Sequence, residues 1–300
     1  MIKLRDLEYL QAIDKYRHFG QAAEACHVSQ PTLSGQMMKL EEQLGLTLVE
    51  RHRRNVMLTP EGTQLVKQAH RVLQEAREFE DIAKALTNPL AGDLHLGLIP
   101  TLAPYLLPYI MQDLTEALPD INFYLHENRT RVLLKELDEG KLDVLILPWL
   151  EGMEGFERYD LFDEPLVLAL PSSHALADDD AITLGALKEQ PVLTLEDGHC
   201  LRDQALGYCF SAGAKEDTRF QATSLETLRY MVSTGLGLTL LPKLAVGSEQ
   251  SIHSITYRNF SDPQPKREIA LLIRPNYTRM ECVRALVASI RDSIKAVKLD

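Results

Sequence analysis

The first sixty residues place hydrophobic side chains at the three- and four-residue spacing of short helices. One apolar run covers residues 4–13 and another covers 33–44, where Gly45 supplies a helix end. Between these runs, Ser29 or Gln30 can begin the later helix, and a proline follows in the first turn, where its missing N–H costs little. The pattern therefore predicts short helices, with a break at residues 27–31 before the last of them.

A two-stranded wing and a much longer helix follow in the pattern. Residues 46–58 predict the wing, which has a basic tip. Thr59 fits the N-cap and Pro60 the first position of a helix whose apolar stripe continues for roughly seven turns. Such length is typical of a coiled-coil-like dimerisation element, and Asn88-Pro89 stops it. We therefore divide the chain into an N-terminal helical region with a wing (1–58), a linker or dimerisation helix (59–88) and a larger C-terminal region (89–300).

Beyond residue 93, short apolar segments alternate with helical ones. The predicted strands are 94–99, 121–126, 142–147, 166–170, 191–195, 238–241 and 269–273, and the predicted helices are 105–118, 131–139 and 280–297. This alternation favours an α/β fold with mostly parallel sheets.

Composition adds limits on location and redox state. Hydrophobic residues make up 45% and charged residues 25%, as in ordinary globular proteins. The sequence contains no apolar run long enough for a membrane helix and begins without the apolar core of a signal peptide, so we expect a cytoplasmic protein with no membrane partner. Cysteines in that compartment are thiols by default, and a disulfide would be regulatory or catalytic. The four are Cys26, Cys200, Cys209 and Cys282.

The net charge of −11 argues by itself against nucleic acid as a partner. Its distribution weakens that objection, because residues 1–88 carry 12 basic and 12 acidic side chains and are neutral. Residues 89–300 carry 20 and 31 and account for the whole excess. Evidence for DNA binding must therefore come from motif geometry and local basic clusters.

Several N-terminal motifs together form a specific signature. They are 19–25 (FGQAAEA), 28–34 (VSQPTLS), 40–41 (LE), 44–45 (LG), 48–51 (LVER) and 58–62 (LTPEG). On these motifs the chain resembles the LysR-type transcriptional regulators over essentially its whole length. The resemblance implies an all-α winged helix-turn-helix, a long linker helix, and an α/β effector domain of two Rossmann-like subdomains similar to periplasmic binding proteins. We expect subdomain I at about 91–163 plus 270–300 and subdomain II at about 164–269. It also implies a homo-oligomer, usually a dimer of dimers, and RNA polymerase as a partner.

The second helix of such a motif enters the major groove of double-stranded promoter DNA. The residues expected at base edges are Ser29, Gln30, Pro31, Thr32 and Ser34. Glutamine can bond adenine through two hydrogen bonds, and the wing arginines can reach phosphates or the minor groove. Those arginines are Arg51, Arg53 and Arg54. The alternative is that the serine and threonine only cap the helix and the arginines form a solvated face; the complete pattern favours DNA contact.

A second set of segments is similar to the hydrogen-peroxide-sensing members of the family. It comprises 98–101 (LIPT), 105–108 (YLLP), 124–127 (YLHE), 195–205 (LEDGHCLRDQA) and 222–229 (ATSLETLR), with Cys209 nine residues after Cys200. The resemblance implies that Cys200 reacts with peroxide and that Cys209 then forms a disulfide with it. It also assigns a peroxide pocket to Thr101, Thr130, His199 and Arg267. A reactive thiol needs an electropositive neighbour that lowers its pKa, and Arg267 is the expected one.

Geometry would make this disulfide a switch. If residues 200–209 are helical when reduced, they rise by about 13 Å. A disulfide requires Cα atoms within roughly 7 Å, so its formation would force the segment to refold. One position departs from the pattern, because Arg219 stands where such relatives often have histidine.

Other interpretations stay open at this point. Cys200 and Cys209 can be unrelated buried thiols, Thr101 and Thr130 can be helix caps, and the other two cysteines are expected to be packed. We expect no metal and no cofactor, because the sequence has no CxxC or HxxxH pair and no phosphate-loop motif. Three functions remain: a non-enzymatic regulator of antioxidant genes that senses peroxide, a LysR-type regulator that senses a small organic anion between its subdomains, and a thiol peroxidase whose N-terminal region mediates assembly.

Overall fold

The computed structural model describes residues 1–51, 56–246, 254–261, 263–297 and 299. It divides into two compact units, Met1–Leu86 and Thr87–Asp300, and each is described by itself. In the described part of the chain, no helix combines the length and the apolar character needed to cross a membrane.

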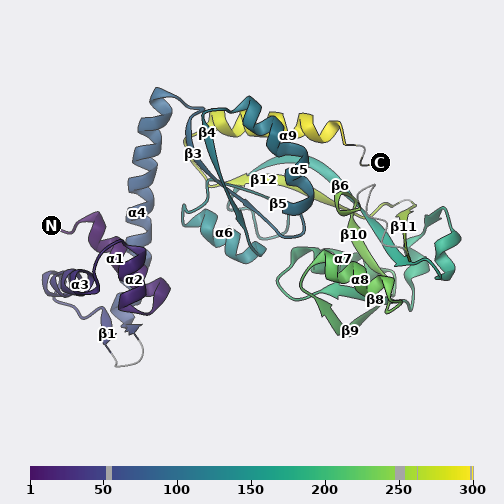
Figure 1. The fold of residues 1–300 in the computed structure, drawn as a ribbon, viewed down its shortest axis with the longest axis horizontal. Coiled ribbons are helices and arrows are strands. Elements are labelled where there is room, and N and C mark those ends of the chain that lie inside the picture. Colours follow the sequence, from purple (N-terminus) through teal and green to yellow (C-terminus); the bar gives the residue numbers. More distant parts are fainter. Residues whose placement is uncertain (52–55, 247–253, 262, 298, 300) are drawn as a thin grey trace. The chain divides into compact units, whose positions relative to one another are not determined.

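The first unit is a helical domain with a small wing (Figure 1). Its elements are α1 (Leu4–Tyr16), α2 (Phe19–Ala25), α3 (Gln30–Leu44), β1 (Val49–Arg51), β2 (Val56–Leu58) and α4 (Pro60–Thr87). The helix-spaced side chains Ile13, Leu33 and Met37 are fully buried in one core, as the pattern predicts. Gly45 ends α3 in the left-handed conformation (φ 68°).

The turn before α4 explains why a threonine and a glycine stand there. Thr59 is buried, accepts a hydrogen bond from the Gly62 N–H at 2.9 Å, and donates to the Thr47 carbonyl at 2.8 Å. A Cβ at Gly62 would lie 2.1 Å from the Leu48 carbonyl oxygen, so only glycine fits there. The first turn of α4 is thereby fixed to the domain.

Helix α4 changes character along its length. Val66, Ala69 and Leu73 are buried against the domain, whereas Val72, Phe79 and Ile82 are exposed. Large apolar side chains at this spacing on an exposed face fit a helix that pairs with another helix.

The second unit contains two sheets. Its strands are β3 (Gly92–Leu98), β4 (Ile121–Glu127), β5 (Val144–Pro148), β6 (Glu157–Pro171), β7 (Ala181–Ile182), β8 (Pro191–Leu195), β9 (Lys215–Ala222), β10 (Thr239–Pro242), β11 (Ile255–Phe260) and β12 (Lys266–Ile273). The larger sheet has the order β4-β3-β5-β12-β6-β11-β7, with β10 also paired to β6, and the smaller sheet pairs β8 with β9.

The expectation of mostly parallel sheets was wrong. Strand β3 pairs in parallel with β4 and β5, as the βαβ pattern predicts. Strand β6, however, pairs antiparallel with β10, β11 and β12, and β12 also pairs antiparallel with β5. The reason is that β6 carries the chain out of the first subdomain and β12 carries it back, so that the two must run in opposite directions.

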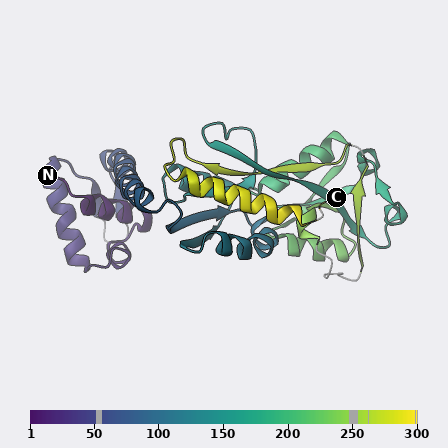
Figure 2. The same cartoon turned by 90° about the horizontal axis from the view of Figure 1, so that it is seen from above.

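Five α-helices complete the described part of this unit: α5 (Ala103–Ala117), α6 (Thr130–Asp138), α7 (Cys200–Ser211), α8 (Leu225–Ser233) and α9 (Met280–Lys295). Helices α5 and α9 lie together on one side of the β3–β5 sheet and α6 lies on the other (Figure 1). Figure 2 shows α9 lying lengthwise over the strands. Short 3-10 turns occur at Ala175–Asp178, Leu184–Leu187 and Lys243–Ala245.

Two hydrophobic cores define two subdomains. The first is built on β3, β5 and β12 with α5, α6 and α9, and the second on β8 and β10 with α7 and α8. Strand β6 belongs to both, because Leu161 lies in the first core and Leu166 in the second. Cys200 packs in the first core, although Leu201, Ala205 and Cys209 after it on α7 pack in the second.

Candidate functional site

The predicted DNA-reading residues lie at the start of α3. Ser29, Gln30, Pro31 and Thr32 are exposed, and Ser34 is half-buried. Ser29 is the N-cap, and its hydroxyl accepts from the Thr32 N–H at 3.3 Å and lies 2.8 Å from the Thr32 hydroxyl. Ser29 therefore caps α3. Contact with DNA bases stays a prediction for all five of the residues named above.

The wing is only partly described. Its strands pair antiparallel, with Val49 opposite Leu58 and Arg51 opposite Val56. Arg53 and Arg54, which we expect at the wing tip, lie outside the described residues.

Cys200 is the first residue of α7 and is buried, with 6% of its surface exposed. His199 precedes it as the N-cap, and Gly198 takes a positive φ of 93° that allows the sharp turn. Burial raises the pKa of the Cys200 thiol above its ordinary value, while an interaction with the Thr130 hydroxyl and the charge of Arg267 act in the opposite direction. Arg267 thus acts on the pKa of Cys200 in the expected direction, but desolvation of the buried thiol outweighs its effect in this conformation.

Arg267 is fully buried and held on two sides. Its Nε donates to the Glu164 carboxylate at 2.6 Å, and both side chains of this ion pair are completely buried. Its Nη1 and Nη2 donate to the hydroxyl and carbonyl oxygens of Thr101 at 3.2 and 2.9 Å. The second Glu164 oxygen accepts from the Leu244 N–H at 3.1 Å, which fixes the carboxylate. This network fixes a cation whose field reaches Cys200.

Thr130 and His199 complete the group expected at the pocket. Thr130 begins α6, and its hydroxyl oxygen is buried without a well-aligned hydrogen-bond partner in the described structure. Its influence on the Cys200 pKa nevertheless places it beside the thiol. Burial, followed by the positive charge of Arg129, lowers the pKa of His199, and Glu196 opposes this effect. This shift favours the neutral form of the His199 imidazole.

Cys209 has a different environment at the other end of α7. It is fully buried in the second core, and burial alone raises its pKa to about 12. All four cysteines are free thiols. Because the helix is continuous between them, Cys200 and Cys209 are separated by an axial rise of about 13 Å, too far for a disulfide.

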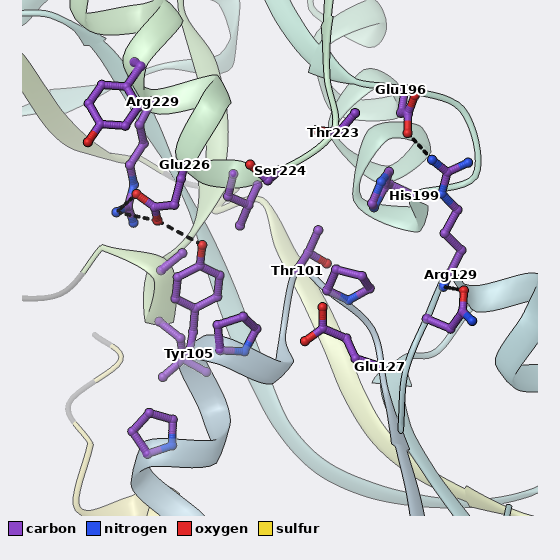
Figure 3. Close-up of a pocket in the computed structure, with 18 of the residues that line it drawn as sticks. Thr101, Tyr105, Glu127, Arg129, Glu196, His199, Thr223, Ser224, Glu226 and Arg229 are labelled. Atoms are coloured by element: carbon purple, nitrogen blue, oxygen red, sulfur yellow. Dashed lines mark hydrogen bonds and ion pairs between the residues drawn. The ribbon is translucent and has the colours of Figure 1, made fainter. Parts of the chain in front are cut away.

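An open cleft with a volume of about 1330 Å³ adjoins this group (Figure 3). Thr101 and His199 line it, whereas Cys200, Thr130 and Arg267 are not among its lining residues. On the opposite wall, the Tyr105 hydroxyl donates to Glu226 at 3.1 Å, and Arg229 donates to the same carboxylate oxygen at 3.1 Å. The thiol thus lies behind the cleft wall rather than in it.

The sequence assigned no role to three charged residues of this region: Arg129, Glu164 and Glu196. The role of Glu164 follows only from the register between β6 and β12, which places it directly opposite Arg267. Arg219, the departure noted in the sequence, donates two hydrogen bonds from its guanidinium and one from its backbone N–H to Asp217, and it is not among the residues that line the cleft. Within the described ranges, no group of three or more His, Cys, Asp or Glu side chains is arranged to hold a metal ion.

Fold and site together define a DNA-binding regulator with a thiol-containing effector domain, and comparison with known proteins places it. Residues 4–63 match the bacterial regulatory helix-turn-helix protein, lysR family, and residues 87–295 match the LysR substrate binding domain. The chain belongs to the LysR family.

Individual members of the family are similar to this chain over nearly its whole length. A hydrogen peroxide-inducible genes activator of Dickeya chrysanthemi is 48% identical over 98% of this chain and 96% of its own length. The DNA-binding transcriptional dual regulator OxyR of Escherichia coli (strain K12) is 48% identical over 97% of this chain and 95% of its own. A solved cysteine-to-aspartate variant of full-length OxyR from Pseudomonas aeruginosa aligns with a TM-score of 0.76 at 37% identity, covering 97% of this chain and 98% of the other.

Proposed function

We propose that this protein is a transcription regulator of antioxidant genes that senses hydrogen peroxide through Cys200 and switches by forming a Cys200–Cys209 disulfide. One observation carries the proposal: the two thiols stand at opposite ends of one helix and in two different cores. A bond between them requires α7 to unwind and Cys200 to leave the first core. The names of the relatives, which describe peroxide-inducible activation, point the same way.

The chemistry proceeds in two steps. The Cys200 thiolate attacks one peroxide oxygen, the O–O bond breaks, and the products are a sulfenic acid and hydroxide, which takes up a proton as water. Thr101, Thr130 and Arg267 would hold the peroxide oxygens and stabilise the leaving oxygen. The Cys209 thiol then condenses with the sulfenic acid, forming the S–S bond and releasing a second water. Peroxide is the oxidant, and the protein is not an enzyme because the disulfide persists as a signal.

The N-terminal unit supplies the output. We propose that α3 enters the major groove of promoter DNA through Ser29, Gln30, Pro31, Thr32 and Ser34, and that Arg51, Arg53 and Arg54 bind the backbone or minor groove. RNA polymerase in the cytoplasm is the expected downstream partner. The exposed apolar residues of α4 support a homo-oligomer, assembled as a dimer of dimers.

A second candidate function rests on the cleft. Its volume of about 1330 Å³ and its polar wall of Tyr105, Glu226 and Arg229 would suit a small organic ligand. In that case the cysteines would be incidental and DNA binding would respond to a metabolite.

Peptide mapping of the protein after one equivalent of peroxide, combined with DNA footprinting of both forms, separates the two candidates. The proposal expects a Cys200–Cys209 linkage and an altered footprint, both reversed by a reductant. If both thiols stay free while the footprint still responds to peroxide, the disulfide switch is wrong. A footprint that responds only to small anions would support the second candidate.

A further inference from the structure

A side-chain bridge ties the loop before Cys200 to the other subdomain. Arg129 lies between β4 and α6, and its guanidinium forms an ion pair with Glu196, shown in Figure 3 beside His199. Its Nη1 also donates to the Asp197 carbonyl oxygen at 3.2 Å. Both acceptors lie in the loop that joins β8 to α7, so one arginine holds two successive residues of that loop.

The same arginine covers the turn that carries the thiol. A Cβ at Gly198 would lie 3.2 Å from the Arg129 Cδ, which shows that the arginine stem packs directly on this glycine. The backbone of Arg129 is itself fixed, because its N–H donates to the Asn128 side chain at 2.9 Å and it is the N-cap of α6. A fixed residue of the first subdomain therefore restrains the Gly198–Cys200 turn of the second.

We propose that Arg129 is a positioning residue that retains this turn in its reduced place and thereby slows disulfide formation more than it affects the reaction with peroxide. The inference rests on the proposed function. In the first step Cys200 reacts where it lies, and the loop need not move. In the second step the Cys200 sulfenic acid must travel to the Cys209 thiol before the S–S bond forms and water leaves, and the contacts of Arg129 with Glu196 and Asp197 must break first.

The exposure of the bridge sets the size and the salt dependence of the effect. The side chains of Arg129 and Glu196 are 45% and 33% exposed, so dissolved ions screen their attraction. A pair of this kind contributes up to about 1 kcal/mol, which corresponds to up to about a fivefold change in a rate. The restraint therefore slows the movement of the loop without preventing it, and salt weakens it.

The test compares the two rates in Arg129→Gln and in the unmodified protein. The first rate is the appearance of sulfenic acid in a Cys209→Ser background, trapped with a dimedone-type probe. The second is the appearance of the Cys200–Cys209 linkage by quenched peptide mapping. We expect the ratio of the second rate to the first to rise by up to about fivefold, and added salt to raise it in the unmodified protein but not in the variant.

Matched variants locate the effect. Arg131→Gln removes an exposed charge from the first turn of α6, two residues from Arg129, and it should leave the ratio unchanged. Glu196→Gln removes the same ion pair from the other side and should reproduce the effect of Arg129→Gln. Exchange of the two charges, Arg129→Glu with Glu196→Arg, should restore a slow second step.

Two results would overturn the proposal. An unchanged ratio in both Arg129→Gln and Glu196→Gln, with the linkage still forming, would show that Arg129 does not restrain the turn. It would not contradict the proposed function. An effect on the first rate alone, with a shifted pH profile, would place Arg129 at the thiol chemistry instead. If the unmodified protein forms no linkage at all, both the restraint and the proposed function are wrong.

Discussion

The two ends of α7 place the same functional group in opposite settings. The Thr130 hydroxyl and the charge of the buried Arg267 both act on the Cys200 thiol, which belongs to the first core. Cys209 is surrounded by apolar side chains of the second core, and burial is the only cause of its raised pKa. Both thiols are buried, but only one has polar groups that can bind a small oxidant. Under the proposed function, the neighbouring groups rather than burial distinguish the reactive thiol from the packed one.

The strongest test of this contrast removes Cys200, the thiol with polar neighbours. Cys200→Ser should abolish the response to peroxide, since a serine hydroxyl does not attack the O–O bond at neutral pH. The measurement is the peroxide-dependent change in the DNA footprint. Cys282→Ser changes another fully buried thiol and should retain the response. A response that survives in Cys200→Ser would show that the polar surroundings do not mark the reactive site.

Removal of Cys209, the thiol with apolar neighbours, should affect only the second step. Cys209→Ser should still consume one equivalent of peroxide, because Cys200 and its neighbours are intact, but oxidation should stop at sulfenic acid. Mass spectrometry after dimedone labelling measures this, with Cys26→Ser as the control. Labelling on any residue other than Cys200 would contradict the assigned roles.

The buried cation should matter to stability as well as to reactivity. Arg267→Ala leaves the completely buried Glu164 without its partner, and breaking such a pair costs about 3–5 kcal/mol of unfolding free energy. Urea denaturation measures this loss, and the first step should slow in parallel. Lys266→Ala breaks the adjacent exposed pair with Asp163 and should cost no more than about 1 kcal/mol. Equal losses in the two variants would mean that Arg267 is not held as described.

The pH dependence of the first step should report the raised pKa of Cys200. The thiolate is the reactive form, and burial keeps the pKa above the ordinary value, so the rate should rise by about tenfold per pH unit from pH 6 to 8. Stopped-flow measurement on Cys209→Ser isolates this step. A rate that is already level at pH 6 would mean that Arg267 and Thr130 outweigh burial.

Local patterns predicted the elements well where one side of an element is buried. The strand at 191–195 and the start of the last helix at Met280 agree with the structure. Strand β9, strand β11, helix α8 and the first half of β6 were missed. Strand β9 is mostly exposed and lacks a clear apolar alternation, so its sequence gives a weak signal.

The candidate site was predictable from motifs that are contiguous in the chain and from the family resemblance. His199 and Cys200 lie in one run, and Arg267 and Thr101 came from the family resemblance. Glu164 could not be found this way, because its role depends on a register that pairs residues more than a hundred positions apart. The burial of Cys200 behind the cleft also depends on packing between subdomains, which no local pattern encodes.

Strand β6 is shared by the two halves of the effector domain. Its first part pairs with β12 and its second with β10 and β11, so the same backbone is hydrogen-bonded within both cores. Opening either core would fray a strand on which the other depends. We therefore expect a single cooperative transition for this domain, with amide protons near Leu166 among the slowest to exchange with solvent. A rearrangement of α7 would then leave the pairing of β6 with its neighbouring strands unchanged.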